Sequence, residues 1–159
     1  MTTDIGKTEV ATLRDEAAVR HVIEGYADAV TRRDAQAYGA MYAPEAVWVV
    51  GPPIDRRVEG REAIVAELSG EIARLDFFVF TVGNIVISIS GDVATSRSTV
   101  HEVGRAAEGA PPGLPAMEVH ARYDDELRRE GDHWVFTKRH YSILYLDTNI
   151  PTGQAFPIT

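Results

Sequence analysis

The stretch Glu24–Val50, EGYADAVTRRDAQAYGAMYAPEAVWVV, decides the fold. Before Arg32, its apolar residues follow three- and four-residue spacing, which is typical of one buried face of a helix. Asp34 can cap a second short helix, and Pro44 is expected to stop that helix. Val47–Val50 has the composition of a short buried strand. The order therefore predicts a helix, a tight joint, a second helix and then a strand.

The flanking sequence extends this pattern in both directions. We expect a loose polar segment over residues 1–11, with the first helix beginning near Thr12. A third helix is predicted from Arg61 to Leu75, and Ala106 to Ala116 is predicted to be a loop because it is rich in proline and glycine. The remaining segments have strand composition or period-two alternation, and we expect strands at 77–82, 85–90, 93–104, 117–129 and 134–146.

Helices at the start of the chain and strands at its end are typical of an α+β fold. The predicted helices should cover one face of a strongly bent, mostly antiparallel sheet. A length of 159 residues suits one domain, which we place at residues 12–147, followed by a tail at residues 148–159.

Composition excludes several classes of partner. The net charge is −8, with only 16 lysines and arginines, so we expect neither nucleic acid nor an acidic membrane as a partner. The absence of cysteine excludes disulfides and thiolate chemistry. The first twelve residues lack the apolar core of a signal peptide, and no apolar run reaches the length of ~18 residues that suggests a membrane span. A cytoplasmic location is therefore expected.

Cofactor and metal motifs are also missing from the sequence. No glycine-rich phosphate loop is present, and no His-x-His or helical His-x-x-x-His pair occurs. The close histidine–carboxylate pairs, Glu118 with His120 and Asp132 with His133, have the pattern of exposed residues. We therefore expect no cofactor and no metal site.

Several segments, in this order and spacing, resemble the SnoaL-like branch of the nuclear transport factor 2-like superfamily. They are Tyr26–Val30, Asp34, Tyr42–Trp48, Gly60–Ile64, Tyr123–Leu127, and Gly131 with Trp134–Phe136. The resemblance implies a cone-shaped α+β barrel, in which the bent sheet wraps around a long helix and encloses a deep apolar pocket. It also implies cofactor-free proton transfer on hydrophobic small molecules, as in dehydratase, isomerase and polyketide cyclase relatives, and a homodimer or homotrimer.

The catalytic positions of these relatives are altered here. Dehydratase relatives place an aspartate at the end of the first helix, which matches Thr31. Their partner histidine matches the aromatic run that begins at Phe77. The base of the ketosteroid isomerase relatives matches Val50, whereas their tyrosine is retained as Tyr26. If this protein is an enzyme, another acid or base must act.

His140 is the strongest candidate for that acid or base. On a regular strand it shares a face with Trp134 and Phe136, while Arg139 is expected on the opposite face. An imidazole in the pocket wall could move a proton near neutral pH. The alternatives are a core histidine satisfied by a carbonyl, or an outward residue beyond a bulge.

His101 and Glu102 are further candidates, and as neighbours on one strand they must face opposite sides. Alternation from Ala94 places Glu102 inward together with Ser96, although a bulge would reverse this. Tyr26 lies on the buried helical stripe, where it is either ordinary core or a hydrogen-bond donor to a substrate oxygen.

Five aromatic residues are expected to shape the substrate site: Tyr42, Trp48, Phe78, Tyr123 and Trp134. The leading hypothesis is a cofactor-independent lyase, isomerase or cyclase acting on a hydrophobic cyclic or polyketide-like molecule. The alternatives are a non-catalytic small-molecule-binding protein of the same fold, and an assembly module that uses its open sheet face.

Overall fold

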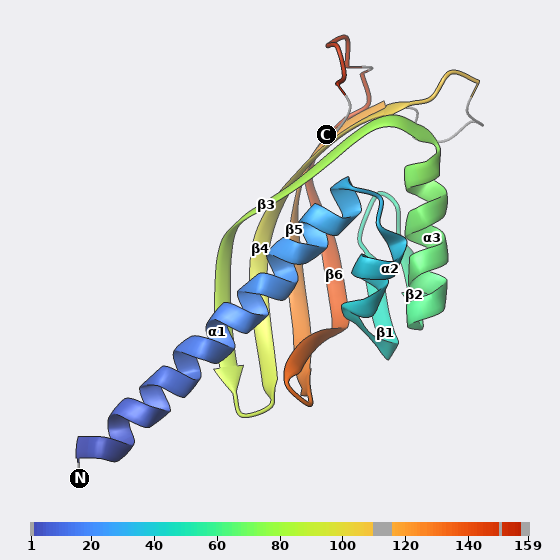
Figure 1. Ribbon diagram of the computed structural model, residues 1–159. Helices are drawn as coiled ribbons and strands as arrows, with labels where there is room; N and C mark the ends of the chain where they lie inside the picture. Colours follow the sequence, from blue (N-terminus) through green and yellow to red (C-terminus); the bar gives the residue numbers. More distant parts are fainter. Residues whose placement is uncertain (1, 110–115, 150, 157–159) are drawn as a thin grey trace.

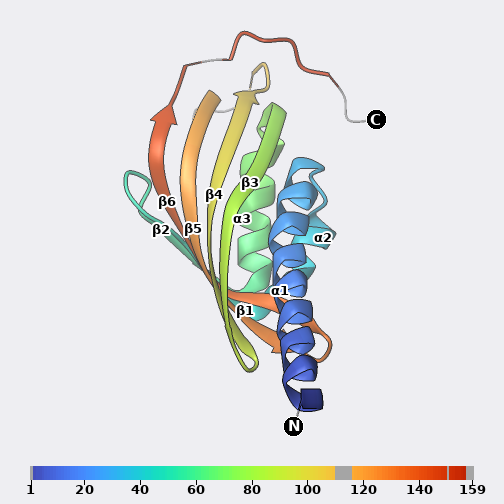
Figure 2. The ribbon, with the colours of Figure 1, turned by 90° about the vertical axis from the view of Figure 1, so that its left-hand side faces the viewer.

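The computed structural model describes residues 2–109, 116–149 and 151–156, and it confirms the predicted α+β architecture. Figures 1 and 2 show the three helices on the same side of one six-stranded, curled sheet, which does not close. The strand order is β2-β1-β6-β5-β4-β3, and every neighbouring pair is antiparallel except β1 with β6. The elements are α1 (Thr2–Thr31), α2 (Ala35–Ala40), β1 (Tyr42–Val50), β2 (Arg56–Glu59), α3 (Arg61–Ala73), β3 (Leu75–Ser90), β4 (Val93–Ala106), β5 (Ala116–Glu130) and β6 (His133–Asp147).

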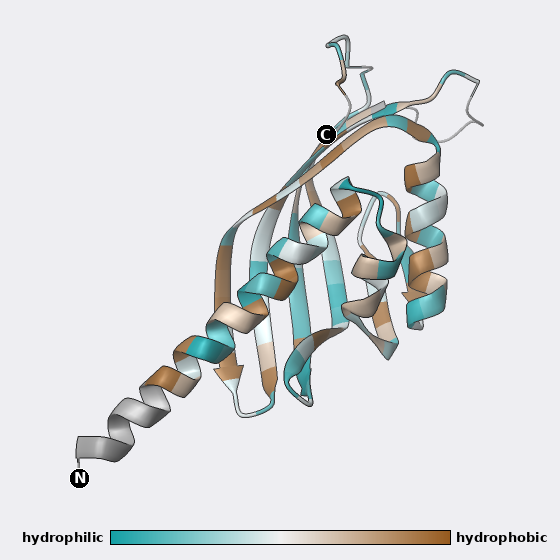
Figure 3. Ribbon diagram, in the orientation of Figure 1, coloured by the Kyte–Doolittle hydropathy of each residue, from teal (hydrophilic) through white to brown (hydrophobic). Residues whose placement is uncertain are grey.

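Helix α1 crosses the sheet and supplies the centre of the core. Its apolar stripe, which includes Val19, Ile23 and Tyr26, is buried as predicted, and Figure 3 shows hydrophobic and hydrophilic residues alternating along the helix. The predicted start at Thr12 is wrong, because the helix already begins at Thr2. The segment before Thr12 contains no proline, so no residue there is incompatible with a helical backbone.

The joint between α2 and β1 is only partly as predicted. Asp34 caps α2, since its Oδ1 accepts a hydrogen bond from the backbone N–H of Ala37 at 2.9 Å. Pro44, however, does not stop the helix, because α2 ends at Ala40 and Pro44 lies inside β1. The pairing of β1 with β6 is irregular between Tyr42 and Val47. A proline is tolerated at such an irregularity, where its missing N–H removes no ladder hydrogen bond.

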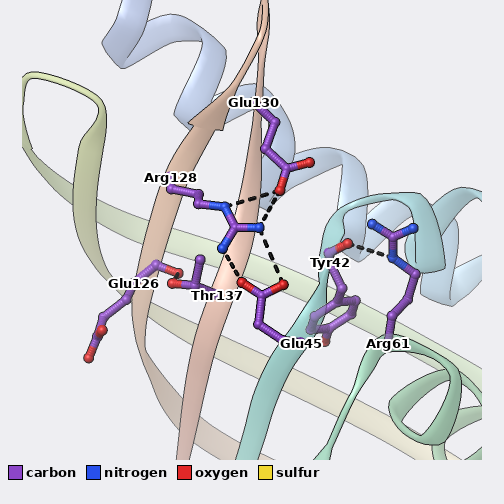
Figure 4. A network of polar contacts seen from close by, with 7 residues as sticks. All are labelled: Tyr42, Glu45, Arg61, Glu126, Arg128, Glu130 and Thr137. Carbon is purple, nitrogen blue, oxygen red and sulfur yellow. Dashed lines mark hydrogen bonds and ion pairs between the residues drawn. The ribbon is translucent and has the colours of Figure 1, made fainter.

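Side chains from neighbouring elements hold this irregular part of β1 (Figure 4). Arg61 donates its Nε–H to the backbone carbonyl of Tyr42 at 2.7 Å. Arg128 of β5 donates to the carboxylates of Glu45 and Glu130. These contacts join the irregular part of β1 to α3 and to β5.

Two strand predictions needed correction. The short strand β2 is polar and was not predicted; it pairs with β1 at the sheet edge. The two segments predicted at 77–82 and 85–90 form one strand, β3, whose register shifts between Gly83 and Val86 and whose Asn84 has a φ of 49°. Of the predicted loop at 106–116, residues 110–115 lie outside the described residues.

A bulge in β6 determines which of its side chains face the helices. Leu127 of β5 pairs with Phe136, and Glu126 pairs with Lys138, so Thr137 has no partner of its own in the register. One extra residue reverses the facing of every residue after it. Arg139 is therefore buried, and His140 faces the opposite side of the sheet.

In the described part of the chain, no helix has the length and apolar character needed to cross a membrane.

Candidate active site

A cavity of about 440 Å³ lies between the helices and the sheet. Its wall is mostly apolar, with few polar groups in the interior and three charged side chains, Arg56, Glu71 and Arg74, from the outer elements. A pocket of this size and character suits a small hydrophobic molecule. The apolar wall includes Val30, Trp48, Val50, Leu68, Ile72, Phe78, Phe80, Val119 and Ile143.

Glu102 places an ionisable group in this apolar wall. Strand β4 keeps an unbroken register with β5, so alternation from Ala94 through Ser96 and Ser98 carries Glu102 to the buried face, as predicted. Its exposed fraction is 9%, and the hydroxyl of Tyr141 donates a hydrogen bond to its Oε1 at 2.8 Å. This hydrogen bond reaches across β5 and joins β4 to β6 at one side of the cavity.

Burial raises the pKa of Glu102 from 4.5 to about 7, against the opposing effects of the Tyr141 hydrogen bond and the nearby His101. A carboxyl group with a pKa near 7 is present in both protonation states at neutral pH. It can therefore accept a proton from a substrate and return it in a later step. Strongly shifted carboxyl groups in apolar clefts are common at catalytic sites.

Tyr26 and Tyr123 supply phenol groups to the cavity wall. Burial raises the pKa of each phenol, so both stay protonated and can donate hydrogen bonds at neutral pH. The guanidinium of Arg139 lies 4.2 Å from the Tyr26 ring, 3.8 Å from the Tyr123 ring and 4.0 Å from the Phe136 ring. These cation–π contacts fix the orientation of both phenols.

A buried ion pair anchors this aromatic group. Arg139 donates Nε–H and Nη2–H bonds to the two carboxylate oxygens of Asp125, at 2.8 and 3.1 Å. Both side chains are almost fully buried. The predicted outward orientation of Arg139 is thus wrong, and the bulge at Thr137 is the reason. The sequence signal for the pair was weak, since each residue sits in a run of charged neighbours.

The predicted orientation of His140 is also wrong. It is half-buried on the sheet face that points away from the helices, and it does not contribute to the cavity wall. His101 lies on the same outer face, where its Nε2 is 2.8 Å from Oε1 of Glu118. Within the described part of the chain, no histidine lines the cavity. The catalytic roles assigned to His140 and His101 thus have no support from the geometry.

The predicted aromatic wall is divided in the structure. Trp48, Phe78 and Tyr123 line the cavity, whereas Tyr42 and Trp134 lie behind its wall. The Tyr42 ring packs edge-on against Tyr26 at 5.9 Å. The guanidinium of Arg129 lies over the Trp134 ring, 4.6 Å from its centroid. Both are buried core residues that do not line the cavity.

Tyr141 is the main wall residue that sequence reasoning missed. It is paired with Tyr123 across β5 and β6, and their rings are 5.0 Å apart. Its inward orientation depends on the unmatched Thr137, for which the sequence gives no signal.

Thr31 has a structural role at the position that the resemblance matches with a catalytic aspartate. Its hydroxyl donates to the carbonyl oxygen of Phe80 and accepts a hydrogen bond from the Phe80 N–H, both at 3.0 Å. The pair of bonds joins the end of α1 to β3. The position therefore fixes the helix to the sheet instead of presenting an acid to the cavity.

Comparison with known proteins agrees with this architecture. The family model for the SnoaL-like domain matches residues 11–140. A scytalone dehydratase-like protein from Novosphingobium aromaticivorans has 18% identity and a TM-score of 0.76, covering 91% of this chain and 97% of its own. Hexachlorocyclohexane dehydrochlorinase LinA-type3 from Novosphingobium barchaimii has 20% identity and a TM-score of 0.74, covering 95% and 99%. The Kfla4162 protein from Kribbella flavida has 17% identity and a TM-score of 0.77, covering 86% and 95%. No curated protein matches the chain.

Proposed function

Because the chain belongs to the family of SnoaL-like domains, we propose that it is a cofactor-independent lyase, isomerase or cyclase. Its substrate is a hydrophobic cyclic or polyketide-like small molecule that fits the apolar cavity. The buried carboxyl group of Glu102, held by the hydroxyl of Tyr141, supports this activity most directly. The dehydratase and dehydrochlorinase names of two structural neighbours point in the same direction.

In the proposed reaction, ionised Glu102 removes a proton from a carbon beside a substrate carbonyl group. The electron pair of the broken C–H bond moves into the new C=C bond, and the carbonyl oxygen becomes an enolate oxygen. A neutral phenol, Tyr26 or Tyr123, donates a hydrogen bond to that oxygen, which stabilises the developing charge in a site of low polarity. The enolate then re-forms its carbonyl group. In an isomerisation its electron pair takes the proton from Glu102 at the far carbon of a conjugated dienolate, and in an elimination it expels an oxygen group from the β-carbon, which takes that proton as its C–O bond breaks.

In this mechanism Glu102 moves the proton, instead of His140 or His101. Both imidazoles lie on the outer face of the sheet, whereas proton transfer requires a heavy-atom separation of about 2.6–3.2 Å from the reacting atom or one bridging water. Glu102 is the candidate base in the wall of the cavity.

Hydrogen–deuterium exchange tests the proposal with simple ketones in place of the natural substrate. Purified protein is incubated in D₂O with a panel of apolar cyclic ketones, and deuterium at the α-carbon is followed by mass spectrometry. We expect wild-type protein to accelerate exchange for at least one ketone. Glu102→Gln should reduce that rate by roughly 10²-fold or more, the usual contribution of a general base.

Glu126→Gln is the matched control, because Glu126 lies on the exposed face of β5 and pairs with Lys138 at 3.3 Å. It should exchange at the wild-type rate. Equal exchange by wild type and Glu102→Gln would remove Glu102 from the mechanism.

A non-catalytic ligand-binding protein is the second candidate. Thr31 and Val50 at the positions matched with the acids and bases of relatives favour it. Calorimetry with the same ketones, combined with product analysis, distinguishes the two functions. Tight binding without exchange or turnover would favour a binding protein.

Assembly and location belong to the same proposal. We expect a homodimer or homotrimer and a cytoplasmic location. Sedimentation velocity of the purified chain checks the first, and fractionation of the source cells checks the second.

A further inference from the structure

Three side chains with metal-binding atoms meet on the sheet face opposite the cavity. They are His101 of β4 and Glu118 and His120 of β5, and their ligating atoms all lie within 4.8 Å of one another. The register pairs His101 directly with His120. Glu118 precedes His120 by two residues, so it projects from the same face of the sheet. Backbone pairing alone therefore brings the three groups together.

The separations of these atoms suit a tetrahedral metal ion. The Nε2 of His101 is 2.8 Å from Oε1 of Glu118, and the Nε2 of His120 is 3.9 Å from the same oxygen. Ligands of tetrahedral Zn²⁺, with bonds of about 2.0–2.2 Å, lie roughly 3.4 Å apart. The two observed separations fall on either side of this value. The separations therefore suit one ion, provided that the imidazole rings rotate to direct their Nε2 lone pairs at it.

The two imidazole rings are stacked in parallel, so at least one ring has to rotate before both Nε2 lone pairs can point at one ion. Their centroids are 4.3 Å apart and their planes differ by 7°, with both Nε2 atoms near the same carboxylate oxygen. Side-chain exposures of 41% for His101, 46% for Glu118 and 52% for His120 leave the site open to an ion from solvent and to a water ligand. The arrangement differs from a closed structural site, because one coordination position stays free.

The surroundings add negative charge. Asp147 of β6 is the register partner of Glu118, and Tyr145 is the partner of His120. Tyr145 lies edge-on to the His120 ring at 6.0 Å and also donates its hydroxyl to Asp147 at 3.5 Å. A second carboxylate beside the cluster lowers the cost of bringing a divalent cation to it.

We propose that His101, Glu118 and His120 form a surface site for a divalent transition metal ion of the Zn²⁺ class. Two imidazoles and one carboxylate favour such ions over Mg²⁺ and Ca²⁺, which take oxygen ligands. This proposal replaces the expectation of no metal site. That expectation rested on motifs within one segment, whereas the two histidines belong to different strands and meet only through their pairing. Since His101 precedes Glu102, a bound ion would join β4 to β5 directly behind the cavity wall.

Zinc titration of the full chain, without a histidine tag and after treatment with a chelator, tests the site. Isothermal titration with ZnCl₂ should show one saturable site, and the melting temperature should rise with added zinc. His101→Ala and His120→Ala should each weaken binding roughly tenfold or more, because each removes one ligand from a three-ligand set. Glu118→Gln should weaken it in the same direction.

His133→Ala is the matched control, since His133 is an exposed imidazole at the start of β6, beside Asp132. It should keep wild-type zinc affinity. The substituted side chains are partly exposed, so melting without metal verifies that each variant is folded. Wild-type protein without saturable zinc binding, or a His101→Ala/His120→Ala double variant that binds as tightly as wild type, would overturn the proposal. Neither readout depends on catalytic activity.

Discussion

Replacing Glu102 by Gln measures how much stability the protein loses by burying this carboxyl group. Burial raises the pKa of Glu102 to about 7 in the folded protein, against 4.5 for an ordinary glutamate. The folded state therefore binds this proton more tightly than the unfolded state does. Below pH 4.5 both states are protonated, and the group has no effect on stability.

The loss of stability develops as the pH rises. Between pH 4.5 and 7 the unfolded chain ionises first, so the free energy of unfolding decreases, and the decrease is complete above the folded-state pKa. One pKa unit corresponds to 1.36 kcal/mol, so the full loss above pH 7 is about 3 kcal/mol. Gln cannot ionise, yet its carbonyl oxygen can still accept the hydrogen bond of Tyr141.

Urea unfolding of both proteins from pH 5 to pH 8.5 provides the assay. The free energy of unfolding of Glu102→Gln minus that of wild type should increase with pH, by up to about 3 kcal/mol over this range. Subtraction cancels the titration of groups common to both proteins. Glu126→Gln, at an exposed carboxylate on β5, is the control for the substitution itself. A constant difference for Glu102→Gln would refute the raised pKa and with it the basis for Glu102 as a base at neutral pH.

Three other substitutions test the surroundings of the site. Tyr141→Phe removes a hydrogen bond that lowers the pKa of Glu102, so the midpoint of the pH dependence of exchange should move upward; an unchanged midpoint would contradict the contact. Asp125→Asn leaves the Arg139 charge buried without its partner, and it should lower the free energy of unfolding in urea by about 3–5 kcal/mol. A loss under 1 kcal/mol would show that the ion pair is not formed in solution. Thr31→Val should cost about 1–3 kcal/mol by removing two hydrogen bonds to β3, and Thr31→Ser should restore most of it, as thermal melts can verify.

The architecture was largely predictable because it depends on patterns that extend over many residues. The spacing of Val19, Ile23 and Tyr26 defines one helical face, and the α1 stripe is buried as that spacing requires. Regular alternation in β4 carried Glu102 inward from Ala94, because no bulge interrupts its pairing with β5. Where the pattern is long and regular, the facing of side chains follows directly from it.

The site was less predictable because the β6 side chains that reach it depend on two residues, Thr137 and Leu144, that are unmatched in the pairing with β5. Thr137 shifts the register of β6, so Arg139 and Tyr141 face inward while His140 faces outward. A bulge of one residue does not change the number of apolar residues in a strand, so the composition of the strand does not reveal it. The roles of Tyr141 as hydrogen-bond donor to Glu102, and of Arg139 as the cation against the Tyr26 and Tyr123 rings, therefore follow only from the pairing of the strands.

The anchor at Thr31 has a consequence for any attempt to graft a relative's dehydratase chemistry onto this scaffold. A carboxylate at that position could accept the N–H of Phe80 but could not donate to its carbonyl oxygen. Installing an aspartate there would strip one bond from the helix–sheet anchor and place a charge beside the apolar hollow. Redesign would need a new tether for the end of α1 before any acid–histidine couple could be introduced.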